Sequence, residues 1–97
     1  MRNEKDALMQ RIIETYGENA QVDKVIEEMS ELTKALLKHR RAPEKERAKA
    51  MEDIIDELAD VRITVREMEL LFQCEGAVEE RINYKLKRQM RRMEEQR

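Results

Sequence analysis

The chain has 97 residues, of which 43% are charged and 40% hydrophobic, with a formal net charge of −2. This length fits a single domain, residues 1–97, and two glycines, one proline and no tryptophan argue against a turn-rich sheet protein. Two tyrosines and one phenylalanine are too few for a surface that stacks nucleic-acid bases, so no stable nucleic-acid complex is expected.

The compartment is predicted from cysteine content and from the N-terminus. Cys74 is the single cysteine, which excludes an intrachain disulfide and favours a reducing environment. The charged start, with Arg2, Glu4 and Lys5, does not fit a signal peptide. No apolar run approaches the ~20 residues needed to span a bilayer. We therefore expect a cytoplasmic protein that does not bind membranes.

Two helices are predicted in the first half of the chain. The first runs from about Glu4 to Tyr16, and Gly17 ends it because glycine tolerates the left-handed conformation. Asn19 is predicted to cap the second helix, which extends to about Arg40. The apolar residues of the second helix recur at helical spacing and are Val22, Val25, Met29, Leu32 and Leu36.

Two more helices are predicted in the second half. Pro43 is expected to open the third helix and Gly76 to end it. The third helix has its apolar stripe at Ile54, Leu58, Val61, Val65, Met68 and Phe72. The fourth has its stripe at Val78, Ile82, Leu86 and Met93. We predict an all-α fold of about four helices, a helical bundle completed by oligomerisation to a homodimer or homotetramer, since one chain buries little core.

The two central helices carry the same pattern, in the segments Val25–Leu32 and Ile54–Val61. Each segment reads apolar, apolar, acid, acid, apolar, small, acid, apolar. At about 100° per residue, the second and third acids lie about 60° and about 120° to the same side of the first apolar residue. If the helices pack antiparallel, one edge of the pair gathers four carboxylates, namely Glu28, Glu31, Glu57 and Asp60.

Carboxylates held this close repel each other and must take up protons or cations. Oxygen ligands suit Mg²⁺, with Mn²⁺ as a possible substitute, and not Zn²⁺. Acids at helical spacing are often only a solvated face, but the repeat and its position beside the apolar stripe favour a metal site. Glu27, Asp53 and Asp56 are candidates to orient a water or accept its proton, although a solvated face is the preferred interpretation for Asp53.

Basic residues form a row on the fourth helix at i, i+4, i+7 and i+11, namely Arg81, Lys85, Arg88 and Arg92. Beside a metal site, such cations would bind phosphate oxygens that the metal leaves uncovered. An equally weighted alternative for each residue is a basic helix end that complements its own dipole. Lys85 and Arg92 are the preferred candidates.

The motif Glu27-Glu28-Met29-Ser30-Glu31, followed after 25 residues by Glu57-Leu58-Ala59-Asp60, resembles the signature of MazG-like all-α NTP pyrophosphohydrolases. The resemblance extends from about Glu18 to Arg92. It implies the all-α NTP pyrophosphatase fold, with Mg²⁺ bound by Glu28, Glu31, Glu57 and Asp60. It also implies that Lys85 and Arg92 are the basic residues of the site.

The resemblance further implies hydrolysis of a nucleoside or deoxynucleoside triphosphate to the monophosphate and pyrophosphate, with attack at the α-phosphorus. Members assemble as dimers or dimers of dimers, and helices from two subunits line each site. In such a mechanism Glu27 is a candidate base, and Lys85, Arg88 and Arg92 would hold the phosphate chain.

Three other functions are considered. A non-catalytic scaffold or regulatory bundle with a degenerate acidic site would show the same core pattern, but retention of all four acids counts against it. A di-iron protein would need Glu-x-x-His pairs, and His39 is the one histidine. A nucleic-acid binder using the basic helix is disfavoured by the acidic centre of the chain.

Overall fold

The computed structural model describes residues 3–96, so Met1, Arg2 and Arg97 lie outside the described residues. All regular elements in this range are helical, which confirms the predicted all-α class. They are α1 (Glu4–Tyr16), α2 (Glu18–Arg41), the short 3₁₀ helix η1 (Glu44–Glu46), α3 (Arg47–Leu71) and α4 (Glu75–Glu95). Within residues 3–96, no helix combines the length and the apolar character required to cross a bilayer.

Local hydrogen bonds fix the two ends of α1. The side-chain oxygen of Asn3 accepts a hydrogen bond from the backbone N–H of Asp6 at 2.9 Å and caps the first turn. Gly17 adopts φ +92°, and its N–H donates to the carbonyl of Ile13, so it ends the helix as predicted. The predicted cap at Asn19 is wrong, because α2 begins directly after Gly17. A single residue therefore joins the first two helices.

Two further helix boundaries differ from the sequence prediction. Pro43 precedes η1 instead of opening α3, which begins at Arg47. The predicted stop at Gly76 is also wrong, since α3 ends at Leu71. Gln73 adopts the left-handed conformation (φ 52°), which often follows the end of a helix and which glycine usually provides. Gly76 consequently lies inside α4.

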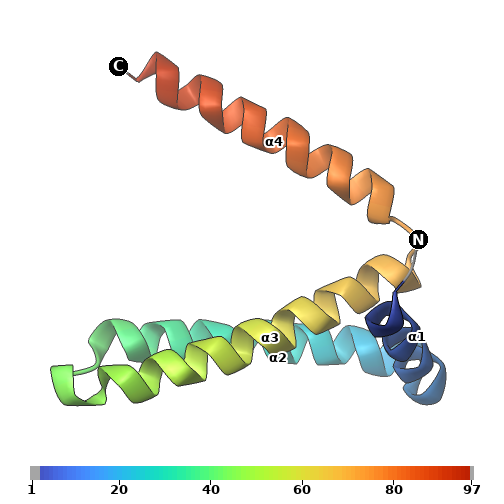
Figure 1. The fold of residues 1–97 in the computed structure, drawn as a ribbon, viewed down its shortest axis with the longest axis horizontal. Coiled ribbons are helices and arrows are strands. Elements are labelled where there is room, and N and C mark those ends of the chain that lie inside the picture. Colours follow the sequence, from blue (N-terminus) through green and yellow to red (C-terminus); the bar gives the residue numbers. More distant parts are fainter. Residues whose placement is uncertain (1–2, 97) are drawn as a thin grey trace.

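The helices form an open arrangement (Figure 1). Helices α2 and α3 lie side by side and antiparallel, and α1 packs across the end where α2 begins. Helix α4 turns away from the pair; among the described elements it contacts only α3, and none of its residues is buried. The radius of gyration is 17.0 Å, compared with about 13 Å for a compact domain of about 100 residues.

The buried faces of α2 and α3 are partly polar. On α2 the buried residues are Gln21, Val25, Glu28 and Ala35. On α3 they are Ala50, Ile54, Thr64, Glu67 and Leu70. Within one chain the predicted stripes are therefore only partly buried. Stripe residues left between 39% and 55% exposed include Met29, Leu36, Leu58, Val65 and Phe72.

A second, apolar face remains exposed on both central helices, rotated by roughly 100° from the buried face. On α2 it comprises Ile26, Met29, Leu36 and Leu37. On α3 it comprises Met51, Ile55, Leu58 and Val65. The stripe predicted on α4 is exposed as well, including Ile82, Leu86 and Met93. Apolar surface of this extent is typical of an interaction site.

Candidate metal centre

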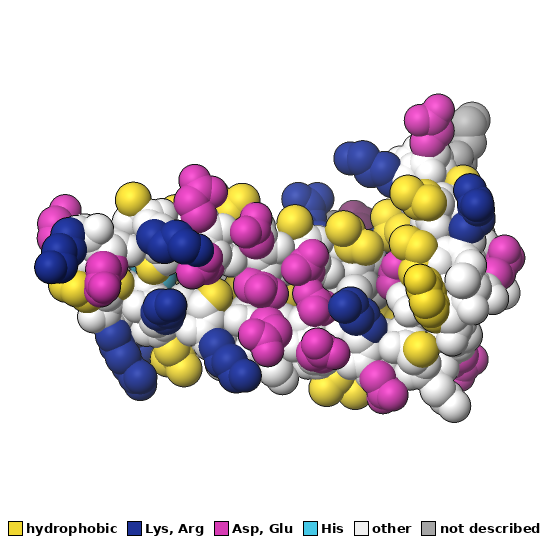
Figure 2. All heavy atoms as spheres, turned by 90° about the horizontal axis from the view of Figure 1, so that it is seen from below, with side chains coloured by type: hydrophobic (Ala, Val, Ile, Leu, Met, Phe, Trp, Pro, Cys, Tyr) yellow, Lys and Arg dark blue, Asp and Glu magenta, His cyan; other side chains and the backbone are white. Residues whose placement is uncertain are grey.

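The acidic repeat gathers carboxylates at the middle of the α2–α3 pair. One oxygen each from Glu28, Glu57 and Asp60 lies within 4.8 Å of the other two. Figure 2 shows acidic side chains collected over the middle of this pair, on the face that points away from α4 in Figure 1. The structure thus brings together three of the four acids that the sequence pattern singles out; we call these three the acidic cluster.

Helical spacing places these acids next to the buried face. Glu28 follows the buried Val25 by three residues, and Glu57 follows the buried Ile54 in the same way. Glu28 is only 7% exposed. One oxygen of Glu57, Oε2, is buried and has no hydrogen-bond partner among the described residues. Because an unpaired buried carboxylate oxygen is costly, a bound cation would stabilise this arrangement.

The acids of the cluster perturb one another. Burial raises the pKa of Glu28, and Asp60 raises it further through a hydrogen bond and through its charge, while Lys24 lowers it. Burial also raises the pKa of Glu57, with further contributions from the charges of Asp60 and Glu31. The cluster therefore has an elevated affinity for protons, and a divalent cation that binds there must displace them.

The fourth predicted metal ligand, Glu31, and the predicted catalytic base, Glu27, lie outside the cluster. The charge of Glu31 is near enough to raise the pKa of Glu57. Its own carboxylate lies 3.5 Å from Nζ of Lys34, so its side chain would have to turn to join the cluster. Glu27 is exposed on α2. The metal role of Glu31 and the catalytic role of Glu27 remain predictions.

The predicted phosphate-binding residues lie on α4, away from the acidic cluster of their own chain. Lys85 and Arg92 are exposed, and the guanidinium of Arg88 lies 5.8 Å from the centroid of the Tyr84 ring. Helix α4 leaves α3 on the side opposite the acidic face (Figures 1 and 2). In this arrangement the basic row does not reach the acidic cluster of its own chain.

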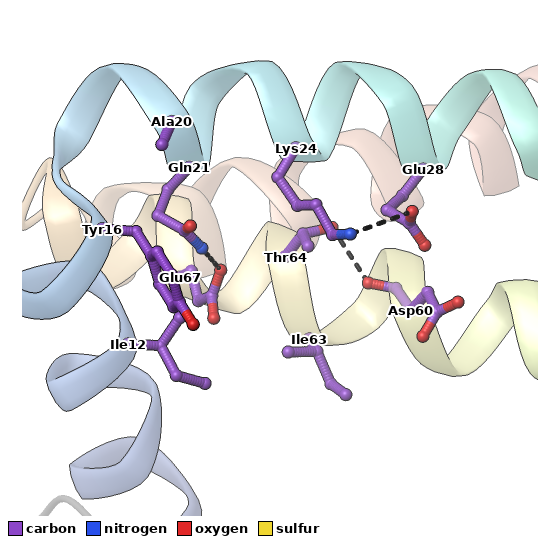
Figure 3. A pocket seen from close by; sticks show the side chains of 10 residues that line it. All are labelled: Ile12, Tyr16, Ala20, Gln21, Lys24, Glu28, Asp60, Ile63, Thr64 and Glu67. Carbon is purple, nitrogen blue, oxygen red and sulfur yellow. Dashed lines mark hydrogen bonds and ion pairs between the residues drawn. The ribbon is translucent and has the colours of Figure 1, made fainter.

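The site includes three residues that the sequence interpretation did not assign. Nζ of Lys24 lies 3.8 Å from a carboxylate oxygen of Glu28 (Figure 3). Gln21 and Glu67 form a buried pair, in which Nε2 of Gln21 donates to Oε1 of Glu67 at 2.6 Å. The available signal was spacing, because Gln21 lies seven residues before Glu28 and Glu67 seven residues after Asp60, on the same helix faces.

The donor set of the acidic cluster defines which cation fits. Carboxylate oxygens from two rigid helices suit Mg²⁺ or Mn²⁺, and an ion of this type completes its coordination with waters and phosphate oxygens. Comparisons with protein-family models, with characterised proteins and with solved structures give no significant match to this chain. The assignment of a function therefore rests on the site and on its sequence motifs.

Proposed function

We propose that the protein is an Mg²⁺-dependent nucleoside triphosphate pyrophosphohydrolase. The observation that carries the proposal is the acidic cluster, with oxygens of Glu28, Glu57 and Asp60 within 4.8 Å of one another on two helices. The buried, unpartnered oxygen of Glu57 supports a cation at this position. The resemblance of the two acidic motifs to MazG-like proteins supports the reaction class and attack at the α-phosphorus.

Each residue of the site has a distinct role in this proposal. The acidic cluster, joined by Glu31, would hold Mg²⁺, with Mn²⁺ as a substitute. When bound, the ion neutralises phosphate charge and lowers the pKa of a coordinated water. Glu27 is the candidate to accept the proton of the attacking water. Lys24, beside Glu28, can donate to a phosphate oxygen that reaches the cluster.

The proposed enzyme is a homodimer or homotetramer with sites shared between subunits. Exposed apolar faces on α2, α3 and α4 support this assembly, as does the lack of any buried residue on α4. A second copy whose α4 crosses the acidic face would supply the basic residues Lys85, Arg88 and Arg92. A separate contact through the exposed apolar faces of α2 and α3 would cover surface that a single chain leaves exposed.

Pyrophosphate release from a panel of ribonucleoside and deoxynucleoside triphosphates tests the proposal. In ¹⁸O-labelled water, the label is expected in the nucleoside monophosphate, which reports attack at the α-phosphorus. Label in orthophosphate, with a nucleoside diphosphate as co-product, would overturn that assignment. A protein that turns over no nucleotide with Mg²⁺ would instead fit the non-catalytic scaffold or regulatory bundle.

A further inference from the structure

A cavity of about 480 Å³ opens beside the acidic cluster, between the end of α1, the first half of α2 and the second half of α3. Glu28 and Asp60 line one end of it, so one ligand can contact both the cavity and the cluster. The apolar part of the cavity wall is formed by Ile12, Tyr16 and Ile63 (Figure 3). The cavity thus offers a partly apolar space next to the proposed phosphate site.

The other end of the cavity carries the buried Gln21–Glu67 pair, in which Gln21 is 6% and Glu67 is 1% exposed. The bond from Gln21 is the one hydrogen bond that the Glu67 carboxylate accepts among the described residues. Oε2 of Glu67 and Oε1 of Gln21 accept no hydrogen bond from another described residue, and both remain in contact with solvent. Buried polar atoms are normally paired, and apolar side chains would fill these positions at lower cost. The pair suits a ligand that brings hydrogen-bond donors.

We propose that this cavity binds the base of the nucleotide and selects bases that carry an exocyclic amino group. This inference rests on the proposed function, which assigns the phosphates to the acidic cluster. The ring would lie among Ile12, Tyr16 and Ile63. The amino group would donate to Oε2 of Glu67 or Oε1 of Gln21, and the second Nε2 hydrogen of Gln21 would serve an unprotonated ring nitrogen.

Cytosine and uracil are matched probes, because they share one ring size and differ at two adjacent positions. Cytosine has an amino group beside an unprotonated N3, whereas uracil has a carbonyl oxygen beside an N3–H. In uracil, the carbonyl oxygen would face the Glu67 carboxylate. Both groups are hydrogen-bond acceptors, so no hydrogen bond could form between them. Sites built to hydrogen-bond a substrate group reject analogues that lack it, so kcat/KM for CTP should exceed that for UTP by about a hundredfold. ATP and ITP make the same comparison for a purine.

The variant Glu67→Gln replaces a carboxylate acceptor with an amide that can donate. It is expected to lower the CTP-to-UTP ratio of kcat/KM by at least about tenfold, with Mg²⁺ affinity unchanged. Glu52→Gln, on the exposed surface of α3, is the matched control and should keep the ratio. N4,N4-dimethyl-CTP removes both amino hydrogens from the ligand and should react like UTP, so the test stands even if Glu67→Gln fails to fold.

The outcomes separate this inference from the proposed function. Equal kcat/KM values within both pairs, CTP with UTP and ATP with ITP, would overturn base selection and leave the hydrolase assignment intact. If no triphosphate is hydrolysed, calorimetric binding of CMP and UMP with Mg²⁺ decides. Preference for CMP that disappears in Glu67→Gln would support the cavity alone and reject the hydrolase. Binding of neither nucleotide would overturn both.

Discussion

Asp6 and Arg66 form a two-pronged salt bridge between α1 and α3, in which Nε donates to Oδ1 at 2.9 Å and Nη2 to Oδ2 at 2.8 Å. Asp6 is only 5% exposed. The same guanidinium pairs with Glu69 on α3 and with Glu75 at the start of α4. These hydrogen bonds, above all those that Arg66 donates to Asp6, hold the pKa of Arg66 above its usual value. Arg66 therefore links α1, α3 and α4 through salt bridges. It also positions α1, the helix that carries Tyr16.

Replacing Asp6 with asparagine is expected to destabilise the fold. The substitution removes the charge that pairs with a largely buried guanidinium, and the expected loss is about 2 kcal/mol in the free energy of unfolding. Urea denaturation followed by circular dichroism measures it. Asp23→Asn, on the exposed surface of α2, is the control and should stay within about 0.5 kcal/mol of the parent. Equal stability of the two variants would contradict the role given to the bridge.

The acidic cluster can be tested with Glu57→Gln. Loss of a charged ligand should weaken Mg²⁺ binding and lower the rate of pyrophosphate release by about a hundredfold or more. The fold should persist, because the substitution removes a carboxylate whose pKa is raised by burial and by neighbouring acids. Glu52→Gln again serves as the control. A Glu57→Gln protein with full activity would refute the metal assignment.

The stability of the metal-free protein should fall as pH rises. The pKa values of Glu28 and Glu57 are raised in the folded state, so between about pH 4.3, the ordinary value, and the raised values the folded state binds more protons than the unfolded state. The stabilisation by protonation is complete below this window and is lost above it. Mg²⁺ should therefore raise the melting temperature more at pH 8 than at pH 5. An equal Mg²⁺ effect at both pH values would count against binding at the cluster.

The shared site predicts complementation between inactive variants. Glu57→Gln lacks a metal ligand on α3, and Lys85→Ala lacks a phosphate contact on α4. If each site combines one chain's acids with another's α4, co-refolding equal amounts should restore about a quarter of the parent activity, since half of random dimers are mixed and each has one intact site. A mixture that remains inactive would show that both residues act within one chain.

The exposed stripe on α4 predicts how assembly can be disrupted. Leu86 is 65% exposed in the single chain. Leu86→Glu would place a charge within an apolar contact and should shift the mass measured by light scattering toward the 11.7 kDa of one chain. The neighbouring Lys87→Glu changes charge outside the stripe and should leave the mass unchanged. If the parent protein itself measures 11.7 kDa at micromolar concentration, the proposed oligomer is wrong.

Three of the four acids predicted to gather do so, and this was predictable from helix geometry once an antiparallel contact was assumed. Glu28 and Glu57 each follow a core residue by three positions, so any antiparallel contact through Val25 and Ile54 brings their carboxylates to one edge. The helical stop at Gly17 was predictable for a similar reason, since it follows from backbone conformation at one residue. Local rules of this kind need no knowledge of the partner surface.

The choice of packing face was not predictable in the same way. On α2 the apolar residues cover a broad arc that includes Val25, Met29 and Leu36, and periodicity does not reveal which part of the arc is covered by the same chain. In the structure, the side of the arc that is buried within the chain is the one that carries Gln21. That side can be buried because Glu67, 46 positions away, accepts its hydrogen bond. Spacing places each of the two residues on the helix face of the acidic motif, but it does not show that they pair with each other over this sequence distance.

Gly17 is the single residue between α1 and α2, so it fixes how the two helices are oriented relative to each other. One residue inserted into either helix at this junction would rotate them relative to each other by about 100° and shift them by about 1.5 Å. That rotation would carry Asp6 away from Arg66 and move Tyr16 off the cavity. At the other end of the pair, the turn at Pro43 bears none of the site residues, and a longer turn there costs little because closure entropy grows slowly with length. An insertion should therefore be tolerated at the Pro43 turn, whereas an insertion next to Gly17 should disrupt the packing of α1.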